Sequence, residues 1–157
     1  MPQYWLMKSE PDVFSIDDLK ARRVAFWDGV RNYMARNYMV RDMKVGDLVL
    51  FYHSNANPSA AVGIARVASP AKPDPTQFDK KSDYFDPKAT VENPRWLAVE
   101  VEYVDSFKHP VPLDLIKRDQ SLKDMVLLNN SRLSVQPVKK SEFEHICKLA
   151  MSSAARQ

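Results

Sequence analysis

The chain has 157 residues, of which 45% are hydrophobic and 27% charged, and this is the size and composition of one globular domain. The single cysteine excludes an intramolecular disulfide and any multi-cysteine metal site, and three isolated glycines exclude a P-loop and a dinucleotide-binding fingerprint. The net charge is only +3, but residues 20–44 contain seven basic and two acidic residues, a local excess that favours an anionic partner. The alternative is a solvated surface whose arginines pair with nearby acids.

The N-terminal residues lack a charged segment followed by an apolar one, and the longest apolar run, residues 48–52, is far shorter than the ~20 residues of a membrane span. We therefore expect no membrane partner and a cytoplasmic protein, associated with the nucleoid, or nuclear in a eukaryote. The three histidines lie far apart in the sequence, and Cys147 shares no helical face with His145. The sequence therefore predicts no metal, no cofactor and no catalytic cysteine.

Hydrophobic periodicity and turn residues predict the elements along the chain. In order, they are a strand at 3–8, a helix at 16–22, a strand at 24–27, a helix at 31–39, strands at 48–53 and 62–67, a strand at 96–104, helical turns at 113–117 and 121–125, a strand at 133–136 and a helix from 141. Short helices interleaved with about six strands predict an α+β fold: a small mixed barrel or strongly curved sheet in one domain, residues 1–151. Residues 152–157 are expected to be a frayed tail.

Three local signals refine these boundaries. Ser15 and Asp18 have the spacing of an N-cap for the first helix, and Ser141 with Glu144 has the spacing of a capping box for the last. Pro137 is expected to stop the last strand. Residues 70–94 contain five prolines, and a connection of this length is usually functional or disordered.

The segment 27–37 combines residues that suit a planar, polar ligand. Trp27 and Tyr33 offer flat surfaces for stacking, and Asn32 can donate and accept hydrogen bonds at a base edge. Arg36 lies four residues after Asn32 and shares its helical face. The alternative is that Trp27 and Tyr33 belong to the core and that Asn32 is a helix cap.

Two further segments and one acid add candidates. Residues 51–55 end an apolar strand abruptly in polar side chains, as ligand sites at strand ends often do, and residues 132–137 place polar side chains on one strand face. Glu10 follows the first strand directly and is fixed in an extended conformation by Pro11. The alternative is that Ser9 and Glu10 only satisfy local backbone donors.

These motifs together resemble the EVE domain family. The resemblance covers residues 3–149 and rests on Tyr4-Trp5-Leu6-Met7-Lys8-Ser9-Glu10-Pro11, Trp27-Asp28-Gly29-Val30-Arg31-Asn32-Tyr33, Phe51-Tyr52-His53-Ser54-Asn55, Pro73-Asp74-Pro75-Thr76-Gln77-Phe78, Tyr84-Phe85-Asp86-Pro87 and Arg132-Leu133-Ser134-Val135-Gln136-Pro137. It implies a PUA-like mixed β-barrel of about five or six strands, related to the YTH readers of methylated RNA. It also implies a non-catalytic reader that flips a modified base, notably 5-methylcytosine or 5-hydroxymethylcytosine in DNA, into a pocket.

Residue by residue, the resemblance implies a base pocket and a set of phosphate contacts. The implied base pocket comprises Lys8, Ser9, Glu10, Trp27, Val30, Asn32, Tyr33, Tyr52, Ser54, Asn55, Ser134 and Gln136. Trp27, with Tyr33 or Tyr52, would stack on the base, and Arg31, Arg36 and Arg132 would hold phosphates. Met34 departs from the family pattern, in which glutamine is usual, so it either alters base preference or fills buried space.

Three other functions compete with this one. The same pocket could take a modified base of RNA. A small hydrolase or nucleobase-modifying enzyme would need a base or nucleophile in the pocket, for which Lys8 and Glu10 are the candidates. A protein-interaction domain would need an exposed apolar patch, which the pattern does not indicate. No required protein partner is predicted.

Overall fold

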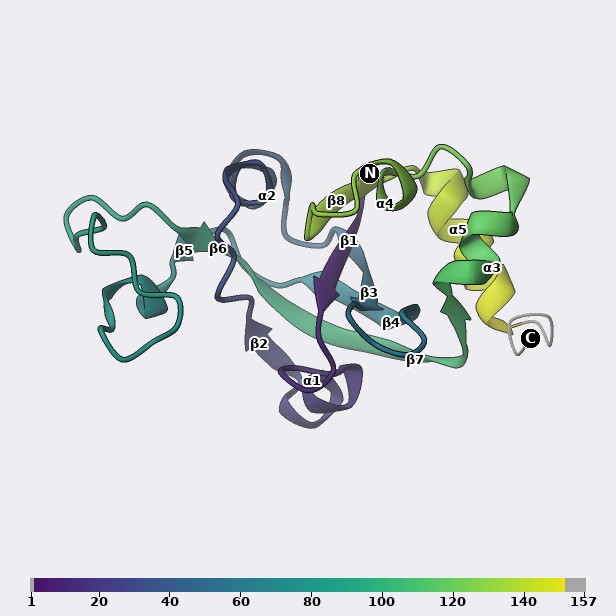
Figure 1. The fold of residues 1–157 in the computed structure, drawn as a ribbon, viewed down its shortest axis with the longest axis horizontal. Helices are drawn as coiled ribbons and strands as arrows, with labels where there is room; N and C mark the ends of the chain where they lie inside the picture. Colours follow the sequence, from purple (N-terminus) through teal and green to yellow (C-terminus); the bar gives the residue numbers. More distant parts are fainter. Residues whose placement is uncertain (1, 152–157) are drawn as a thin grey trace.

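The central feature of the molecule is a six-stranded mixed sheet, seen in a computed structural model that describes residues 2–151 (Figure 1). The strand order is β2-β7-β4-β3-β1-β8. The strands are β1 (Tyr4–Ser9), β2 (Val24–Phe26), β3 (Leu48–His53), β4 (Ala60–Val67), β7 (Glu100–Pro112) and β8 (Val135–Val138). Only β1 and β3 pair in parallel; every other pair in this sheet is antiparallel.

Strand β7 gives the sheet its curvature. It spans 13 residues and bends along its length in Figure 1. Its register against β4 shifts twice, between Ala61 and Gly63 and again between Ile64 and Ala65. Such bulges bend a strand and increase its twist. The sheet therefore curls into a half-barrel, which confirms the predicted mixed barrel of five or six strands with peripheral helices.

Both faces of the sheet are buried because β1 and β3 are apolar at successive positions. Alternate residues of a strand point to opposite faces. Accordingly, Met7 and Phe51 belong to one core cluster, whereas Leu6 and Tyr52 belong to the other. A run such as residues 48–52 is typical of a strand covered on both sides.

Short helices cover the two faces. The helical segments are α1 (Ile16–Arg22), α2 (Tyr33–Asn37) with a following π-helix (Tyr38–Asp42), α3 (Leu113–Arg118), α4 (Val126–Asn129), α5 (Lys140–Met151) and 3-10 turns at Pro75–Phe78 and Gln120–Leu122. Buried residues of α1 and α2 join the cluster that contains Met7, and those of α3, α4 and α5 join the cluster that contains Leu6. None of the helices within residues 2–151 is long and apolar enough to cross a bilayer.

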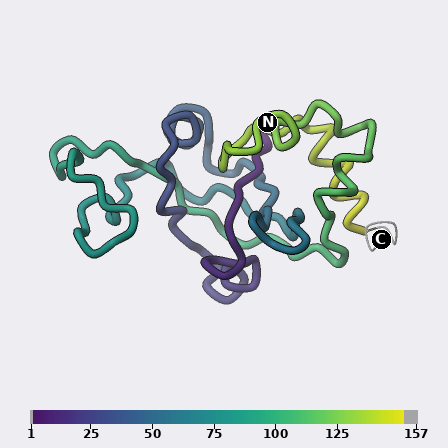
Figure 2. The backbone as a smooth tube through the Cα atoms, in the orientation of Figure 1, coloured from purple at the N-terminus to yellow at the C-terminus, as the bar shows by residue number. Residues whose placement is uncertain are grey.

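The proline-rich connection is ordered and projects from one end of the sheet (Figure 2). Its ends pair as β5 (Lys72–Pro73) and β6 (Leu97–Ala98). The side chain of Gln77, which is fully buried, donates to the Asp74 and Trp96 carbonyls and accepts from the Arg95 and Trp96 N–H groups. The buried Gln77 amide thus supplies four hydrogen bonds that hold the two ends of this connection together.

Several predicted boundaries are wrong, three of them for identifiable reasons. Strand β7 extends to Pro112 because its second half pairs with β4. Strand β8 runs through Pro137, which is tolerated because β8 lies at the sheet edge. Helix α5 begins at Lys140, and the Glu142 carboxylate accepts the Lys139 N–H at 2.9 Å, so the predicted capping box of Ser141 and Glu144 does not form. The predicted frayed tail lies outside the described residues.

His53 makes the stability of this fold sensitive to mild acid. Its Nε2 accepts the Ile16 N–H at 3.1 Å, which satisfies one free donor of the first turn of α1. Burial lowers the pKa of His53 below its usual value, and Asp17 opposes that effect. As pH falls, the unfolded chain therefore takes up the proton first, so stability is full above about pH 6.5 and declines below it.

We expect a variant with a non-titrating acceptor, His53→Gln, to remove this decline. Between about pH 7.5 and pH 5, the wild type should lose about 1 kcal/mol more of its free energy of unfolding than the variant. Urea unfolding at the two pH values measures this difference, and titrations shared by both proteins cancel. Equal losses in the two proteins would contradict the role of His53.

Candidate nucleic-acid interface

A cavity of about 760 Å³ lies where the end of β1 meets the segment that follows β2. Its volume falls within the range of about 300–1,000 Å³ that is usual for small-molecule sites. Its lining residues are Lys8, Ser9, Glu10, Val13, Phe14, Arg22, Phe26, Trp27, Asp28, Gly29, Val30, Arg31, Ser54, Pro75, Tyr84, Ser131, Arg132 and Ser134. Segments from five parts of the chain therefore converge on one hollow.

The structure brings together part of the set that the sequence implied. The lining includes Lys8, Ser9, Glu10, Trp27, Val30, Ser54 and Ser134 of the implied base pocket, with Arg31 and Arg132 of the implied phosphate contacts. The residues that lie outside this lining are Asn32, Tyr33, Tyr52, Asn55, Gln136 and Arg36. Each of these six has another structural role, which follows from where its backbone runs.

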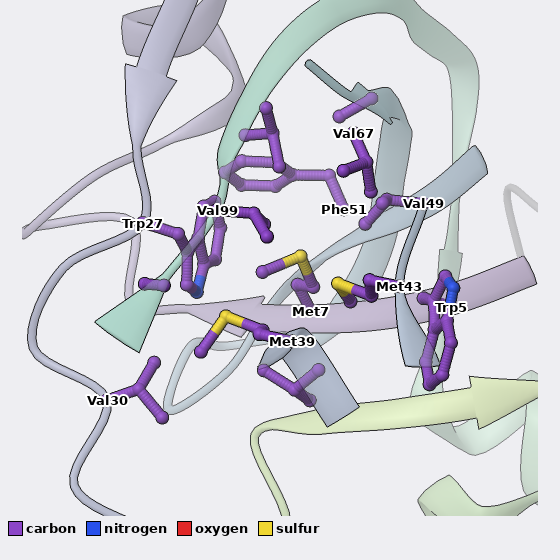
Figure 3. Close-up of a cluster of buried hydrophobic side chains, with 14 of the residues drawn as sticks. Trp5, Met7, Trp27, Val30, Met39, Met43, Val49, Phe51, Val67 and Val99 are labelled. Atoms are coloured by element: carbon purple, nitrogen blue, oxygen red, sulfur yellow. The ribbon is translucent and has the colours of Figure 1, made fainter. Parts of the chain in front are cut away.

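Two aromatic side chains meet at the cavity wall. Trp27 is 7% exposed and lies nearly perpendicular to Phe14 and Phe51, with ring centroids 6.3 Å and 5.4 Å away. In Figure 3, Trp27 lies at one end of the buried cluster and Trp5 at the other. Phe14 lines the cavity beside Trp27, so the structure pairs Trp27 with Phe14.

The two tyrosines expected beside Trp27 lie elsewhere. Tyr52 is 2% exposed and belongs to the core cluster on the opposite face of the sheet, where burial raises its pKa to about 12. Tyr33 stacks on Trp96, with ring centroids 4.8 Å apart. Neither ring lines the cavity. Phe14 could have been suggested by its place just after the Glu10-Pro11 turn.

Three amide side chains support the wall without lining it. Asn32 is the N-cap of α2, where its Oδ1 accepts the Ala35 N–H at 3.0 Å, as the alternative interpretation had it. Asn55 donates from Nδ2 to Glu10 Oε1 at 2.6 Å and so holds that carboxylate. Gln136 is fully buried and donates to the Leu133 carbonyl at 2.7 Å.

Arg31 uses all five of its N–H donors on the protein itself. Nε and Nη2 donate to the Tyr84 carbonyl at 3.0 and 2.7 Å. Nη2 also donates to Thr76 Oγ1, while Nη1 donates to the Val30 carbonyl and to Asp74 Oδ2. Since a guanidinium has five N–H donors, none is left for a phosphate. Arg31 is thus the residue that attaches the 74–84 segment to the cavity.

A ladder of stacked groups extends this attachment. The Arg31 guanidinium lies 5.5 Å from the Tyr84 ring centroid and 5.3 Å from that of Trp96. Tyr33 stacks on Trp96, and the Arg36 guanidinium lies 4.8 Å from the Tyr33 ring. Arg36 also donates to the Arg95 carbonyl at 2.7 Å. Through these contacts, Arg31, Tyr33 and Arg36 of the 27–37 segment attach the long connection to the sheet.

Gly29 shows why this junction needs a glycine. Its φ is +79°, and a Cβ at this position would lie 2.7 Å from Tyr84 Cζ. Its N–H donates to Asp74 Oδ2 at 2.8 Å. The backbone thus passes directly beneath the Tyr84 ring, which forms one edge of the cavity.

Of the exposed cationic groups at the cavity, Arg132 was expected and Arg22 was not. Both line the cavity, and among residues 2–151 no hydrogen bond or ion pair engages either guanidinium. The Arg22 guanidinium lies 5.6 Å from the Phe14 ring centroid. Lys8 donates from Nζ to the Ser131 carbonyl at 2.5 Å, and burial lowers its pKa. Arg22, which belongs to the basic stretch, was missed because neither motif nor spacing marked it.

The acidic wall residue Asp28 was also missed, although it lies within the recognised motif. Partial desolvation raises the pKa of Asp28, and the nearby Asp74 carboxylate adds to this effect. Arg22 and Arg31 act in the opposite direction.

For the part of the chain from 2 to 151, no three histidine, cysteine, aspartate or glutamate side chains are grouped as a metal site requires.

Met34 lies outside the cavity lining and is 52% exposed, so it does not fill buried space.

Cys147 lies on the inner side of α5, where burial raises its pKa to about 11. A thiol with this pKa is protonated at neutral pH and is a poor nucleophile.

Known proteins resemble this chain over nearly its whole length. The model of the EVE domain matches residues 3–149. Mouse thymocyte nuclear protein 1 is 41% identical over 95% of this chain and 74% of its own length. A hypothetical protein from Leishmania major is 48% identical, with a TM-score of 0.93 over 96% of each chain. Human THYN1, solved in complex with DNA containing 5-methylcytosine, is 39% identical, with a TM-score of 0.92 over 96% of this chain and 99% of that one. On the sequence match and the shared half-barrel, this chain belongs to the EVE domain family.

Proposed function

We propose that this protein is a non-catalytic reader of modified bases, which takes a modified cytosine of DNA into the cavity at the end of β1 by base flipping. The carrying observation is the cavity itself, of about 760 Å³, walled by Trp27 and Phe14 and edged by the exposed arginines Arg22 and Arg132. The complex of human THYN1 with DNA containing 5-methylcytosine supports the choice of ligand. The localisation of the present protein, cytoplasmic or, in a eukaryote, nuclear, stays a prediction.

The energetics favour modest affinity. Stacking of a base on an aromatic ring contributes about 1–3 kcal/mol. Extrusion of the base from a duplex costs a few kcal/mol, so these two contributions nearly cancel. Phosphate contacts and hydrogen bonds to the base edge must then supply the net affinity. We therefore expect micromolar binding to duplex and tighter binding to single strands or mismatched sites.

Within this proposal, the wall residues divide by chemistry. Trp27 stacks on the base, with Phe14 as the second aromatic surface. Ser54 and Ser134 provide hydroxyl groups that hydrogen-bond the base edge or its modification. Asn32, Asn55 and Gln136 act by holding the wall, because their side chains bond to Ala35, Glu10 and Leu133.

The proposal is tested with matched DNA and RNA oligonucleotides that carry one plain or one modified cytosine each. We expect tighter binding to the modified DNA. Binding that ignores the modification would contradict a reader, and tighter binding to the modified RNA would move the function to RNA.

The salt dependence of the same titration tests the phosphate contacts. Two to three contacts give a slope of log K against log salt of about −2 to −3. Arg132→Ala should reduce the size of the slope by about 0.9, the contribution of one phosphate contact to a duplex. Lys117→Ala is the matched control, because it removes the same charge from an exposed position of helix α3, which packs against the other face of the sheet. A slope unchanged by Arg132→Ala would remove this arginine from the interface.

The two candidate catalytic groups of the cavity are engaged by the protein. Lys8 Nζ donates to the Ser131 carbonyl, and Glu10 Oε1 accepts from Asn55 Nδ2. A general base must reach the proton that it removes, and neither group pairs with a nucleophile here. This arrangement supports a reader in preference to a hydrolase or nucleobase-modifying enzyme.

A further inference from the structure

Asp28 stands out among the charged residues of the cavity wall. Glu10, the other carboxylate in the lining, accepts a hydrogen bond from Asn55. Across residues 2–151, no side chain or N–H of another residue bonds to the Asp28 carboxylate, which is exposed to the cavity. The Asp28 carboxylate oxygens can therefore accept hydrogen bonds from a ligand without losing a bond to another residue.

The backbone on both sides fixes the position of this carboxylate. The Asp28 N–H donates to the Phe26 carbonyl at 3.0 Å, and the next N–H, that of Gly29, donates to the buried Asp74 at 2.8 Å. Asp28 directly follows Trp27, so its side chain starts one residue from the ring on which the base is proposed to stack. Both residues line the cavity, so a base stacked on that ring shares the cavity with the carboxylate.

The electrostatic surroundings suit a ligand that donates a hydrogen bond. A carboxylate can only accept. Partial desolvation and the Asp74 carboxylate both raise the pKa of Asp28, and Arg22 and Arg31 offset this only in part, so its ionised form is incompletely compensated in the free protein. A neutral N–H donor from a ligand supplies that compensation, whereas a carbonyl oxygen adds repulsion.

Cytosine and thymine differ at this edge. Cytosine presents a 4-amino donor where thymine presents a carbonyl acceptor, and 5-methylcytosine shares its 5-methyl group with thymine. We propose that Asp28 is the specificity-determining residue of this pocket, which accepts a hydrogen bond from the 4-amino group of cytosine and rejects thymine and uracil. This assignment rests on the proposed function, because it requires a base in the cavity.

The test compares single-stranded oligonucleotides that differ at one position, where they carry 5-methylcytosine, cytosine, thymine or deoxyuridine. The ratio of the dissociation constants for thymine and 5-methylcytosine isolates the 4-amino edge, since both bases carry the 5-methyl group. We expect Asp28→Asn to reduce this ratio about tenfold, because the amide can turn its NH₂ group toward the thymine carbonyl. Asp28→Ala should weaken binding of 5-methylcytosine and tighten that of thymine, because the repulsion between the carboxylate and the thymine carbonyl is removed.

The matched control is Asp12→Asn. Asp12 is exposed on the neighbouring turn outside the cavity lining, so this variant removes the same charge without touching the wall. It should tighten binding of all four oligonucleotides equally, through weaker repulsion of phosphates, and leave the ratio unchanged.

The outcomes separate this assignment from the proposed function. If the wild type prefers 5-methylcytosine to thymine and Asp28→Asn keeps that preference, the role of Asp28 is overturned and the reader function stands. If the wild type binds none of the four, the reader function fails and the assignment falls with it. If the ratio of the dissociation constants for thymine and 5-methylcytosine falls in Asp28→Asn and not in Asp12→Asn, the assignment is supported.

Discussion

Trp27→Ala should abolish modification-dependent binding and lower the free energy of unfolding by about 3–5 kcal/mol. Both effects follow from one position. The ring lies in the cavity wall and, being only 7% exposed, also packs perpendicular to Phe14 and Phe51 in the core. Truncation leaves a cavity in the core and removes the stacking surface together.

A milder pair of variants separates binding from stability. Trp27→Phe should weaken binding of modified DNA several-fold, because a phenyl ring offers less stacking surface. Trp5→Phe is the control: Trp5 is 2% exposed in the same cluster but lies outside the cavity lining, and its Nε1 donates to Asp47. It should lower stability and leave affinity unchanged. Urea unfolding and fluorescence anisotropy measure the two quantities. Wild-type affinity in folded Trp27→Phe and Trp27→Ala would remove Trp27 as the stacking residue.

Arg31→Ala should release the long connection from the sheet and lower the free energy of unfolding by about 3 kcal/mol. The variant removes five hydrogen bonds and leaves the buried Asp74, 1% exposed, without its cation. Arg31→Lys should recover little of this loss, because an ammonium group cannot reproduce the planar fork. Hydrogen exchange should then show weaker protection in residues 74–86.

Arg132→Ala is the matched control for this prediction. Arg132 is exposed, and no hydrogen bond or ion pair within residues 2–151 engages its guanidinium, so its removal should change stability by less than about 0.5 kcal/mol. It should instead lower affinity for DNA. If Arg31→Ala behaved like Arg132→Ala, with normal stability and a smaller salt slope, Arg31 would be a phosphate contact after all, as the family resemblance implied.

Local signals were reliable where neighbouring residues alone decide the structure. The Ser15 cap forms as a full capping box, in which Ser15 Oγ accepts the Asp18 N–H and Asp18 Oδ2 accepts the Ser15 N–H. The apolar face of α5 packs as its periodicity predicted, with Phe143, Ile146 and Ala150 buried. The second capping box failed because a competing carboxylate, Glu142, engages the chain two residues earlier, at the Lys139 N–H.

Pairing across the sheet decided what the local pattern could not. Residues 105–112 break the apolar alternation and include two prolines, yet they continue β7, because β4 lies beside them to accept and donate the hydrogen bonds. Pro137 remains in β8 because no further strand pairs on its outer side. Sequence pattern reports propensity, whereas these two outcomes depend on which strand lies next to which.

The same distinction between local sequence pattern and tertiary packing applies to the candidate site. From the sequence alone came the family, the curved mixed sheet and the segments that meet at the cavity, because each rests on contiguous motifs. The tertiary structure assigned the individual side chains: Tyr52 packs in the core on the face opposite the cavity, and the 74–84 segment together with the Val30 carbonyl occupies every donor of Arg31. A side chain's partners come from segments distant in sequence, so a motif can identify the region of a site while packing decides which of its residues face the ligand.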